Sequence, residues 1–141
     1  MSFDTLGELN WLAVVVATIA FFGLGAIWYA PPVFGRAWQR AVGFEMPEGE
    51  RPGPAFYIGP LATCFLATVA TGMLALATAS DTFGEAIALG LVIGLGIAAT
   101  VAFVGGMFDP HKPQPLVWFV IFAGYQLVGL LIVATIVSLW D

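Results

Sequence analysis

Charged residues are scarce in this chain. Of its 141 residues only 9% are charged, 60% are hydrophobic, and the formal net charge is −5. A soluble domain carries about 25% charged residues, and a chain this short cannot bury so much apolar surface in one water-facing core. Four Lys and Arg residues cannot form the basic patch that nucleic acid requires. We therefore expect no nucleic-acid partner, and we expect the lipid bilayer to be the main solvent of the protein.

Residues that bind metals or act as nucleophiles are also rare. The chain has one cysteine, Cys64, which excludes an intrachain disulfide and a cysteine metal cage. It has one histidine, His111, which argues against a His-rich metal or haem site. We find no Ser/His/Asp set and no pair of carboxylates within an apolar segment. The sequence therefore predicts no cofactor and no metal, and it favours a protein that is not an enzyme.

Long apolar runs dominate what is present. Four of them extend over about 9–29, 55–79, 85–108 and 116–140. About 20 helical residues, rising 1.5 Å each, cross a hydrocarbon core of about 30 Å. The first run follows an acidic lead and is too long for a cleaved signal peptide, so we expect a retained span. The sequence predicts an all-α integral membrane bundle of four transmembrane helices, forming a single membrane domain over 1–141.

A short amphipathic segment follows the first span. Pro31 and Pro32 end that span because proline lacks the N–H that the helix ladder needs. Over residues 33–44 apolar side chains then recur at intervals of three and four, with Arg36 and Arg40 on the other side. This pattern predicts an amphipathic helix that lies in the membrane interface with its cations toward lipid phosphates.

Two pairs of residues have the spacing of a capping box, in which a Ser or Thr and a Glu three residues later satisfy each other's backbone donors. Thr5 with Glu8 predicts a helix that begins near Leu6, and Thr82 with Glu85 predicts the start of the third span.

The positions of the cations predict the topology. All four lie in the first or third connection, and none lies in the lead, the middle turn or the C-terminus: Arg36, Arg40, Arg51 and Lys112. By the positive-inside rule both connections are cytoplasmic and both termini lie outside. Aromatic residues at the ends of the spans agree, since Trp and Tyr gather at membrane interfaces. We expect a multi-pass protein of the bacterial inner membrane.

Neutral polar residues near the middle of the spans are the first candidate site. Thr18, Thr68, Thr100 and Gln126 fall at these depths, and Tyr125 lies beside Gln126. If they converge, they form a polar cluster that suits a small molecule or a water-lined path. In the alternative, each threonine bonds the carbonyl four residues earlier, and Gln126 and Tyr125 bond a neighbouring helix. The sequence favours this second interpretation without excluding the first.

A second candidate lies at the cytoplasmic interface. Aromatic and basic side chains there could line a pocket for a lipid headgroup or a quinone-like molecule, although such residues are more often interface anchors. The candidates for headgroup or interface contact are Trp28, Tyr29, Arg36, Trp38, Arg40, His111 and Lys112. His111 beside Asp109 could suggest a metal or a general base, but a lone histidine in a proline-rich turn is more often a solvated loop residue.

Three segments carry a resemblance to a known family. They are Asn10-Trp11-Leu12-Ala13-Val14, the run from Gly25 to Trp38 with its Trp-Tyr-x-Pro-x-x-Phe-Gly-x-x-Trp pattern, and Ala123-Gly124-Tyr125-Gln126-Leu127-Val128 with Leu139-Trp140. Together they resemble a bacterial family of small four-span membrane proteins catalogued as domain of unknown function 1761. The resemblance implies the fold and the topology, and it implies no activity.

Three hypotheses for the function follow. The first is a non-enzymatic membrane component that acts by association, as a homo-oligomer or an accessory subunit. Gly90 and Gly94 form a Gly-x-x-x-Gly pair that lets another helix approach closely, which supports it. The second is a small-molecule permease or channel that uses the neutral polar residues. The third is a lipid-binding protein or membrane enzyme at the cytoplasmic interface.

Overall fold

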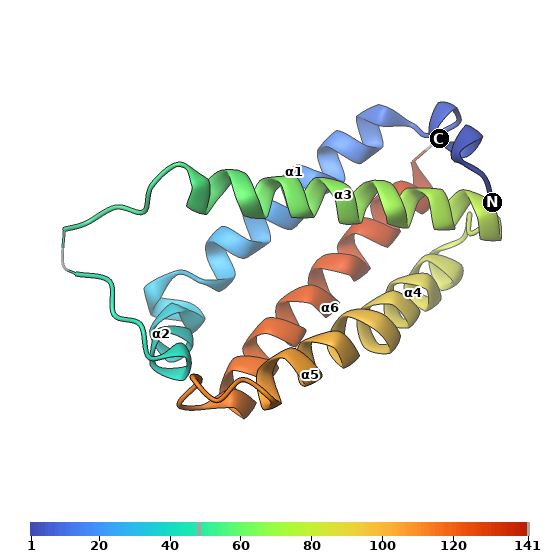
Figure 1. The fold of residues 1–141 in the computed structure, drawn as a ribbon. Coiled ribbons are helices and arrows are strands. Elements are labelled where there is room, and N and C mark those ends of the chain that lie inside the picture. Colours follow the sequence, from blue (N-terminus) through green and yellow to red (C-terminus); the bar gives the residue numbers. More distant parts are fainter. Residues whose placement is uncertain (48, 141) are drawn as a thin grey trace.

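A computed structural model describes residues 1–47 and 49–140, and in that part of the chain all regular structure is helical (Figure 1). Four helices are long and apolar enough to cross a membrane: α1 (Trp11–Trp28), α3 (Ala55–Thr78), a third span over Phe83–Met107, and α6 (Pro115–Leu139). The predicted all-α class with four membrane-spanning helices is confirmed, and each predicted span agrees with its helix to within two residues.

One of the two predicted capping boxes forms. Thr82 and Glu85 cap α4 (Phe83–Leu91) reciprocally, as their spacing predicts. The prediction for Thr5 and Glu8 is wrong, because a short 3-10 helix, η1 (Phe3–Gly7), occupies this lead. The α1 helix begins later, where the side chain of Asn10 accepts hydrogen bonds from two backbone N–H groups in the first turn, each at 3.1 Å.

The segment after α1 turns back on the end of that helix. A π-helical turn, η2 (Pro31–Gly35), leads into α2 (Arg36–Val42), so the predicted helix over 33–44 is present with slightly earlier bounds. A Cβ at Gly35 would overlap the backbone of Tyr29 and Ala30. Only glycine therefore permits this close return of the chain, which places α2 against α6.

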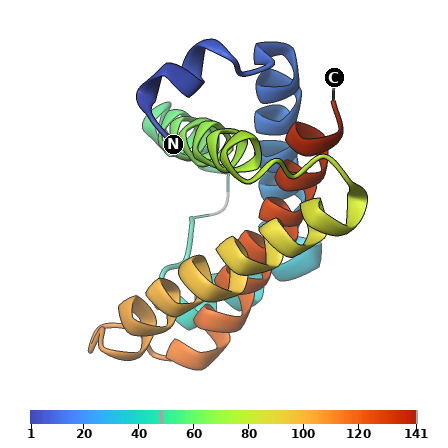
Figure 2. The ribbon, with the colours of Figure 1, turned by 90° about the vertical axis from the view of Figure 1, so that its right-hand side faces the viewer.

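The α6 helix is the centre of the bundle. It contacts α1, α2, α3 and each segment of the third span. Figure 2, seen from the end that holds both termini, shows α3 on one side and α4 and α5 on another. The fourth span therefore organises the other three, and most buried side chains of the core lie on it or face it.

The third span, predicted as a transmembrane helix over about 85–108, is one membrane-crossing helix with an internal π segment. It consists of α4, η3 (Val92–Ala99) and α5 (Thr100–Met107). Small residues recur every four positions along it: Gly90, Gly94, Ala98, Ala102 and Gly106. In an α-helix such positions drift by about 40° per step around the axis. A π segment has more residues per turn and reverses that drift, which keeps the small residues against α6.

Three glycines of this row show how close the contact is. Gly90 faces Leu131, Gly94 faces Leu127 and Gly106 faces Trp118, and a Cβ at each would lie under 3.0 Å from the α6 side chain. The candidate packing residues Gly90 and Gly94 therefore pack within the chain, against its own α6.

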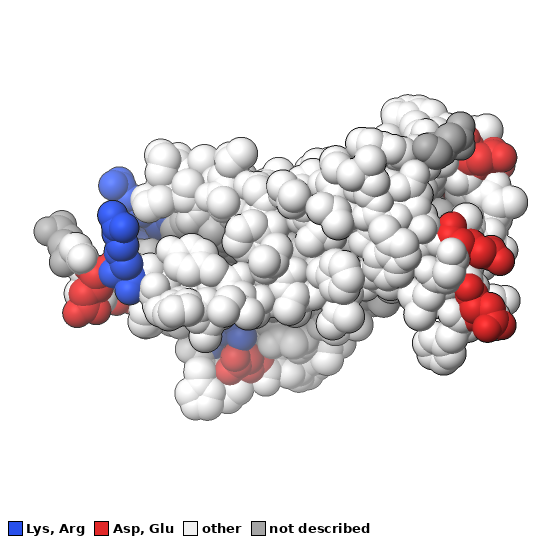
Figure 3. Space-filling view, turned by 90° about the horizontal axis from the view of Figure 1, so that it is seen from above, with Lys and Arg blue, Asp and Glu red and all other residues white. Residues whose placement is uncertain are grey.

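Charges separate toward the two ends of the molecule (Figure 3). We call the end that holds the first and third connections the basic end, because Arg36, Arg40, Arg51 and Lys112 belong to these connections. The other end, the terminal end, holds both termini and the turn between α3 and α4. Acidic side chains lie at both ends. The long surface between the ends is uncharged, as a membrane-spanning surface requires.

The contact between α1 and α6 leaves no room for a side chain at Gly129, so a single methyl group there should disrupt it. A Cβ at Gly129 on α6 would overlap the ring of Phe21, which is fully buried on α1. We expect Gly129→Ala to lower the free energy of unfolding by about 1–3 kcal/mol through overpacking. The measurement is reversible unfolding in mixed micelles.

Gly96→Ala is the matched control, because nothing lies within 4 Å of a Cβ at that position. It should leave stability unchanged or raise it by up to about 1 kcal/mol, since alanine favours helix over glycine. Equal losses for the two variants would contradict this account of the α1–α6 contact.

Candidate functional site

Aromatic side chains gather where α1 turns toward α2. We call Trp28, Tyr29, Phe34, Trp38 and Tyr125 the aromatic cluster. The rings of Trp38 and Tyr29 lie 5.9 Å apart, and those of Tyr29 and Tyr125 lie 5.4 Å apart, both pairs edge to face. Trp28 packs on Phe34 with ring centroids 4.8 Å apart. Aromatic pairs prefer such tilted arrangements, so the cluster is a well-packed unit.

Hydrogen bonds and glycines hold this cluster on α6. The Trp28 Nε1–H donates to the carbonyl of Ile121 at 3.0 Å, and the Trp28 ring lies over Gly124. The Tyr125 hydroxyl donates to the carbonyl of Phe21 at 3.2 Å and lies 3.5 Å from Cys64 Sγ. The segments that carry the family resemblance in the first and fourth spans therefore contact each other directly.

The structure thus brings Trp28, Tyr29 and Trp38 together and joins them to Tyr125. The Tyr29 ring packs against Trp38 and Tyr125, and the Trp28 ring packs against Phe34 and Gly124. None of these residues lines the apolar groove between α3 and the third span. The geometry is that of a helix-packing contact at one end of the membrane domain.

The mid-membrane polar residues do not form one group. Each of the three threonines donates to the carbonyl four residues before it: Thr18 to Val14 at 2.7 Å, Thr68 to Cys64 at 2.8 Å, and Thr100 to Gly96 at 3.0 Å. Thr18 and Thr68 are buried in the bundle, whereas Thr100 lies exposed on the outer surface. This is the local hydrogen bonding that the second interpretation of these residues describes.

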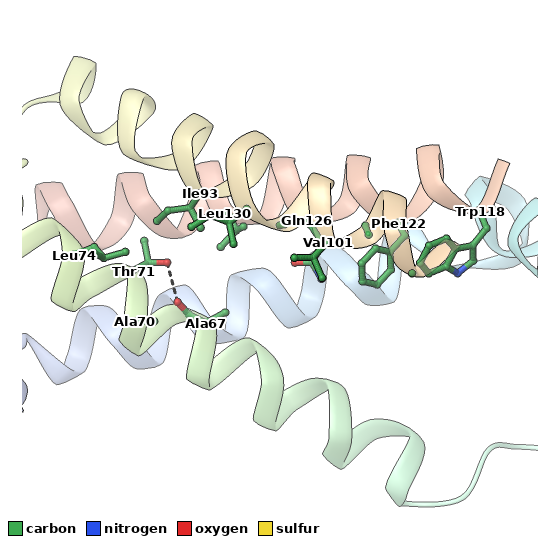
Figure 4. A pocket seen from close by; sticks show the side chains of 14 residues that line it. Ala67, Ala70, Thr71, Leu74, Ile93, Val101, Trp118, Phe122, Gln126 and Leu130 are labelled. Atoms are coloured by element: carbon green, nitrogen blue, oxygen red, sulfur yellow. Dashed lines mark hydrogen bonds between the residues drawn. The ribbon is translucent and has the colours of Figure 1, made fainter. Parts of the chain in front are cut away.

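An apolar groove of about 520 Å³ lies between α3 and the third span, with α6 as its floor (Figure 4). Small side chains line both walls, among them Ala67 and Ala70 on α3 and Ala102 and Gly105 on α5. The floor is a row of α6 residues four positions apart: Trp118, Phe122, Gln126 and Leu130. The rings of Trp118 and Phe122 stack with centroids 5.0 Å apart.

Gln126 is the candidate that lines this groove, and no hydrogen bond joins its amide to the described residues. Sequence analysis named Gln126 but missed Trp118, Phe122 and the α3 wall. The four-residue spacing from Trp118 to Leu130 could have indicated one face of α6. The partner wall could not be found in this way, because it depends on how α3 crosses α6.

The first half of α3 stands apart from the bundle. We call Ala55–Thr63 the α3 arm. Every residue of the arm is exposed, and nothing lies within 4 Å of a Cβ built on Gly59. Its large side chains are apolar: Phe56 is 53% exposed, Tyr57 51%, Ile58 64% and Leu61 43%. Helices α1 and α6 each bury residues along their length, whereas the arm buries none, so within the described part of the chain it is a helical segment without close helix partners.

The loop between α5 and α6 holds a compact ion pair. Lys112 Nζ lies 2.5 Å from Asp109 Oδ2 and 4.6 Å from the centre of the Trp118 ring. The backbone N–H of His111 donates to Asp109 at 2.9 Å, while the His111 side chain is 92% exposed.

The other candidate cations, Arg36 and Arg40, are exposed on α2. The described residues contain no group of three His, Cys, Asp or Glu that could hold a metal ion.

The Lys112 ammonium lowers the pKa of Asp109 from its ordinary 3.8 to about 2, aided by the backbone N–H of His111. Because the folded pKa is depressed, the pair stabilises the fold above about pH 4, and this contribution is lost as the pH falls through about 2.

Lys112→Met should raise the pKa of Asp109 toward 3.8, as measured by carboxyl ¹³C chemical shifts. His111→Ala retains the backbone donor and should leave the pKa low; equal shifts in the two variants would contradict this assignment.

The contact between the first and fourth spans predicts energetic coupling. A Cβ at Gly25 would lie 3.0 Å from the Tyr125 hydroxyl, so Gly25→Ala should destabilise the fold. Tyr125→Phe removes that hydroxyl. The double variant should therefore be more stable than the sum of the single effects predicts, by about 0.5 kcal/mol or more. Gly23→Ala, which meets nothing within 4 Å, should show effects that add with Tyr125→Phe; coupling of the same size there would refute the contact as its cause.

Comparison with known protein families agrees with this architecture. The family described as "Protein of unknown function (DUF1761)" matches residues 12–138. No curated protein and no solved structure matches the chain. The matched region includes the aromatic cluster, the groove and all but one residue each of α1 and α6. With its four apolar helices, this multi-pass membrane protein belongs to that family of unknown function.

Proposed function

We propose that this protein is a non-enzymatic component of the bacterial inner membrane that acts by associating with membrane proteins through the α3 arm. The single observation that carries the proposal is the complete exposure of Ala55–Thr63. A membrane helix satisfies its backbone hydrogen bonds internally and needs no partner for that purpose. A helix that diverges from its own bundle, however, has side chains that pack on no other helix and are free to pack on another protein. The arm is a helical segment of this kind.

The charges support one orientation for this component. The four cations belong to the connections at the basic end, and the positive-inside rule places such connections in the cytoplasm. Both termini then lie outside. The arm begins directly after the 43–54 connection, at the basic end. In this orientation the proposed contact lies in the cytoplasmic half of the membrane.

The geometry gives the two alternatives less support. A permease that uses the neutral polar residues needs them to line a shared path, whereas Thr100 is exposed on the outside and Thr18 and Thr68 are buried with their own local hydrogen bonds. A lipid-binding protein or interface enzyme needs basic groups beside a pocket, whereas Lys112 is paired with Asp109, and neither Arg36 nor Arg40 lines the groove. Association through the arm requires no such convergence.

The test compares one residue on the arm with an equally exposed residue of the same type elsewhere. Ile58 is 64% exposed on the arm, and Ile19 is 62% exposed on α1. A photo-crosslinking amino acid at Ile58 should give protein adducts in living cells. The same group at Ile19 should give mainly lipid adducts, because we expect that face to contact the bilayer.

Two results would count against the proposal. One is equal protein adducts from Ile58 and Ile19, which would mean that the arm is not a preferred contact. The other is a lone monomer in native nanodiscs together with no crosslinked neighbour in cells. In either case the arm would be an ordinary lipid-facing helix.

A further inference from the structure

The groove and the arm have the same cause, which is the tilt of α3. The second half of α3 packs against α1 and α6, and its first half diverges from them (Figure 4). This divergence exposes the arm on all faces. It also leaves one side of the groove open between Ala70 on α3 and Val101 on α5, which is 68% exposed. An unpartnered helix and an unfilled apolar groove therefore adjoin each other in one chain.

The two surfaces are complementary in shape. Small residues such as Ala67, Ala98 and Gly105 form the groove walls and permit another helix to approach closely. The arm carries large apolar side chains, among them Phe56 and Leu61, that can fill the groove.

Their depths in the membrane also agree. From Trp118 to Leu130 the groove extends twelve residues along α6, about 18 Å, and it begins three residues after the start of that helix. The arm extends about 14 Å from the start of α3. Both helices start at the basic end. Two copies that stand side by side in the same orientation therefore present arm and groove at the same level.

We infer that the occupant of the groove is the α3 arm of a second copy of this chain, so that each copy inserts its arm into the groove of the other. A two-fold axis along the membrane normal relates the copies, and the exchange closes into a dimer with no unused arm or groove. This inference rests on the proposed function, since it names the partner that the arm contacts.

Exposed apolar area on α3 is available for such a pair. Phe56 is 53% exposed, Tyr57 51% and Phe65, which lies two residues beyond the arm, 39%. At about 150–250 Å² per aromatic side chain, these three alone hold roughly 300 Å² of exposed surface. A standard interface buries about 800 Å² on each partner. Ile58, Leu61 and Leu66 add to this total, as do the groove walls.

Gln126 supplies an independent argument for a protein occupant rather than an acyl chain. Its amide faces the groove near the middle of the membrane without a hydrogen-bond partner among the described residues. An acyl chain offers no donor or acceptor at that depth. The arm ends in Thr63, whose hydroxyl donates to Pro60 at 2.9 Å and can still accept a bond. Thr63 lies eight residues after the start of α3, about 12 Å along its axis, and Gln126 lies eleven residues after the start of α6, about 16.5 Å, so these axial distances differ by less than one helical turn.

The first experiment fills the groove. Ala70 and Ala77 are both exposed alanines on α3, but only Ala70 lines the groove. Ala70→Phe should weaken dimerisation in lipid vesicles at least tenfold, as measured by energy transfer between labelled copies. Ala77→Phe should leave it unchanged. An unchanged dimer in Ala70→Phe, or equal losses in both variants, would overturn the arm-in-groove contact.

The second experiment locates the contact without disrupting it. Two differently tagged copies, both carrying Cys64→Ala, are coexpressed, one with Leu61→Cys on the arm and the other with Val101→Cys in the groove. Oxidation should give a mixed disulfide dimer, whereas Leu61→Cys paired with Ile19→Cys on the far helix α1 should give none. A disulfide needs Cα atoms within about 7 Å, so the product reports direct contact.

The outcomes separate this inference from the proposed function. If Ile58 crosslinks to other proteins in cells but the Leu61–Val101 disulfide does not form, the arm has a different partner and only the self-association is overturned. If native mass spectra show a monomer that carries lipid and Ile58 gives no protein adducts, both are overturned. A dimer with the Leu61–Val101 disulfide supports both.

Discussion

Close approach of neighbouring helices to α6 is the constraint on which the rest of the structure depends. Lipid is as apolar as leucine, so helices in a bilayer are not driven together by hydrophobic burial and must gain from packing and hydrogen bonds instead. Glycines provide the packing: Gly129 receives Phe21, and Gly94 receives Leu127. The hydrogen bonds from Trp28 to Ile121 and from Tyr125 to Phe21 add direction. These contacts fix α1 and the third span on two sides of α6.

The α3 helix follows a different course because it lacks such contacts along its first half. Its second half packs near Leu9 and Val137, where Gly72 allows close approach. Its first half lies away from the bundle. The tilt that results creates both the exposed arm and the open groove. The proposed role in association rests on this incomplete bundle, in which an exposed arm and an open apolar groove adjoin each other.

Several local features were predictable because they depend on neighbouring residues alone. The Thr82–Glu85 cap needs only its own first turn, and the four spans need only length and apolar composition. The cap at Thr5 was misjudged because Asn10 offers a better start immediately before the apolar run. The π segment was not predicted. It keeps the small residues that recur every four positions against α6, so the reason for it exists only once α6 packs on the third span.

The sequence by itself determined the number of spans, their ends and the placement of all four cations in the first and third connections, because these follow from hydrocarbon thickness and from the cost of placing charge in lipid. It also showed that the runs around Trp28 and Tyr125 belong to one family pattern. Only the tertiary structure decided that these two runs touch, that Thr100 faces outward while Thr18 and Thr68 face inward, and that Gln126 opens into a groove. The reason is that hydropathy is nearly uniform around these helices, so which face meets which neighbour is set by the shapes of side chains distant in the sequence.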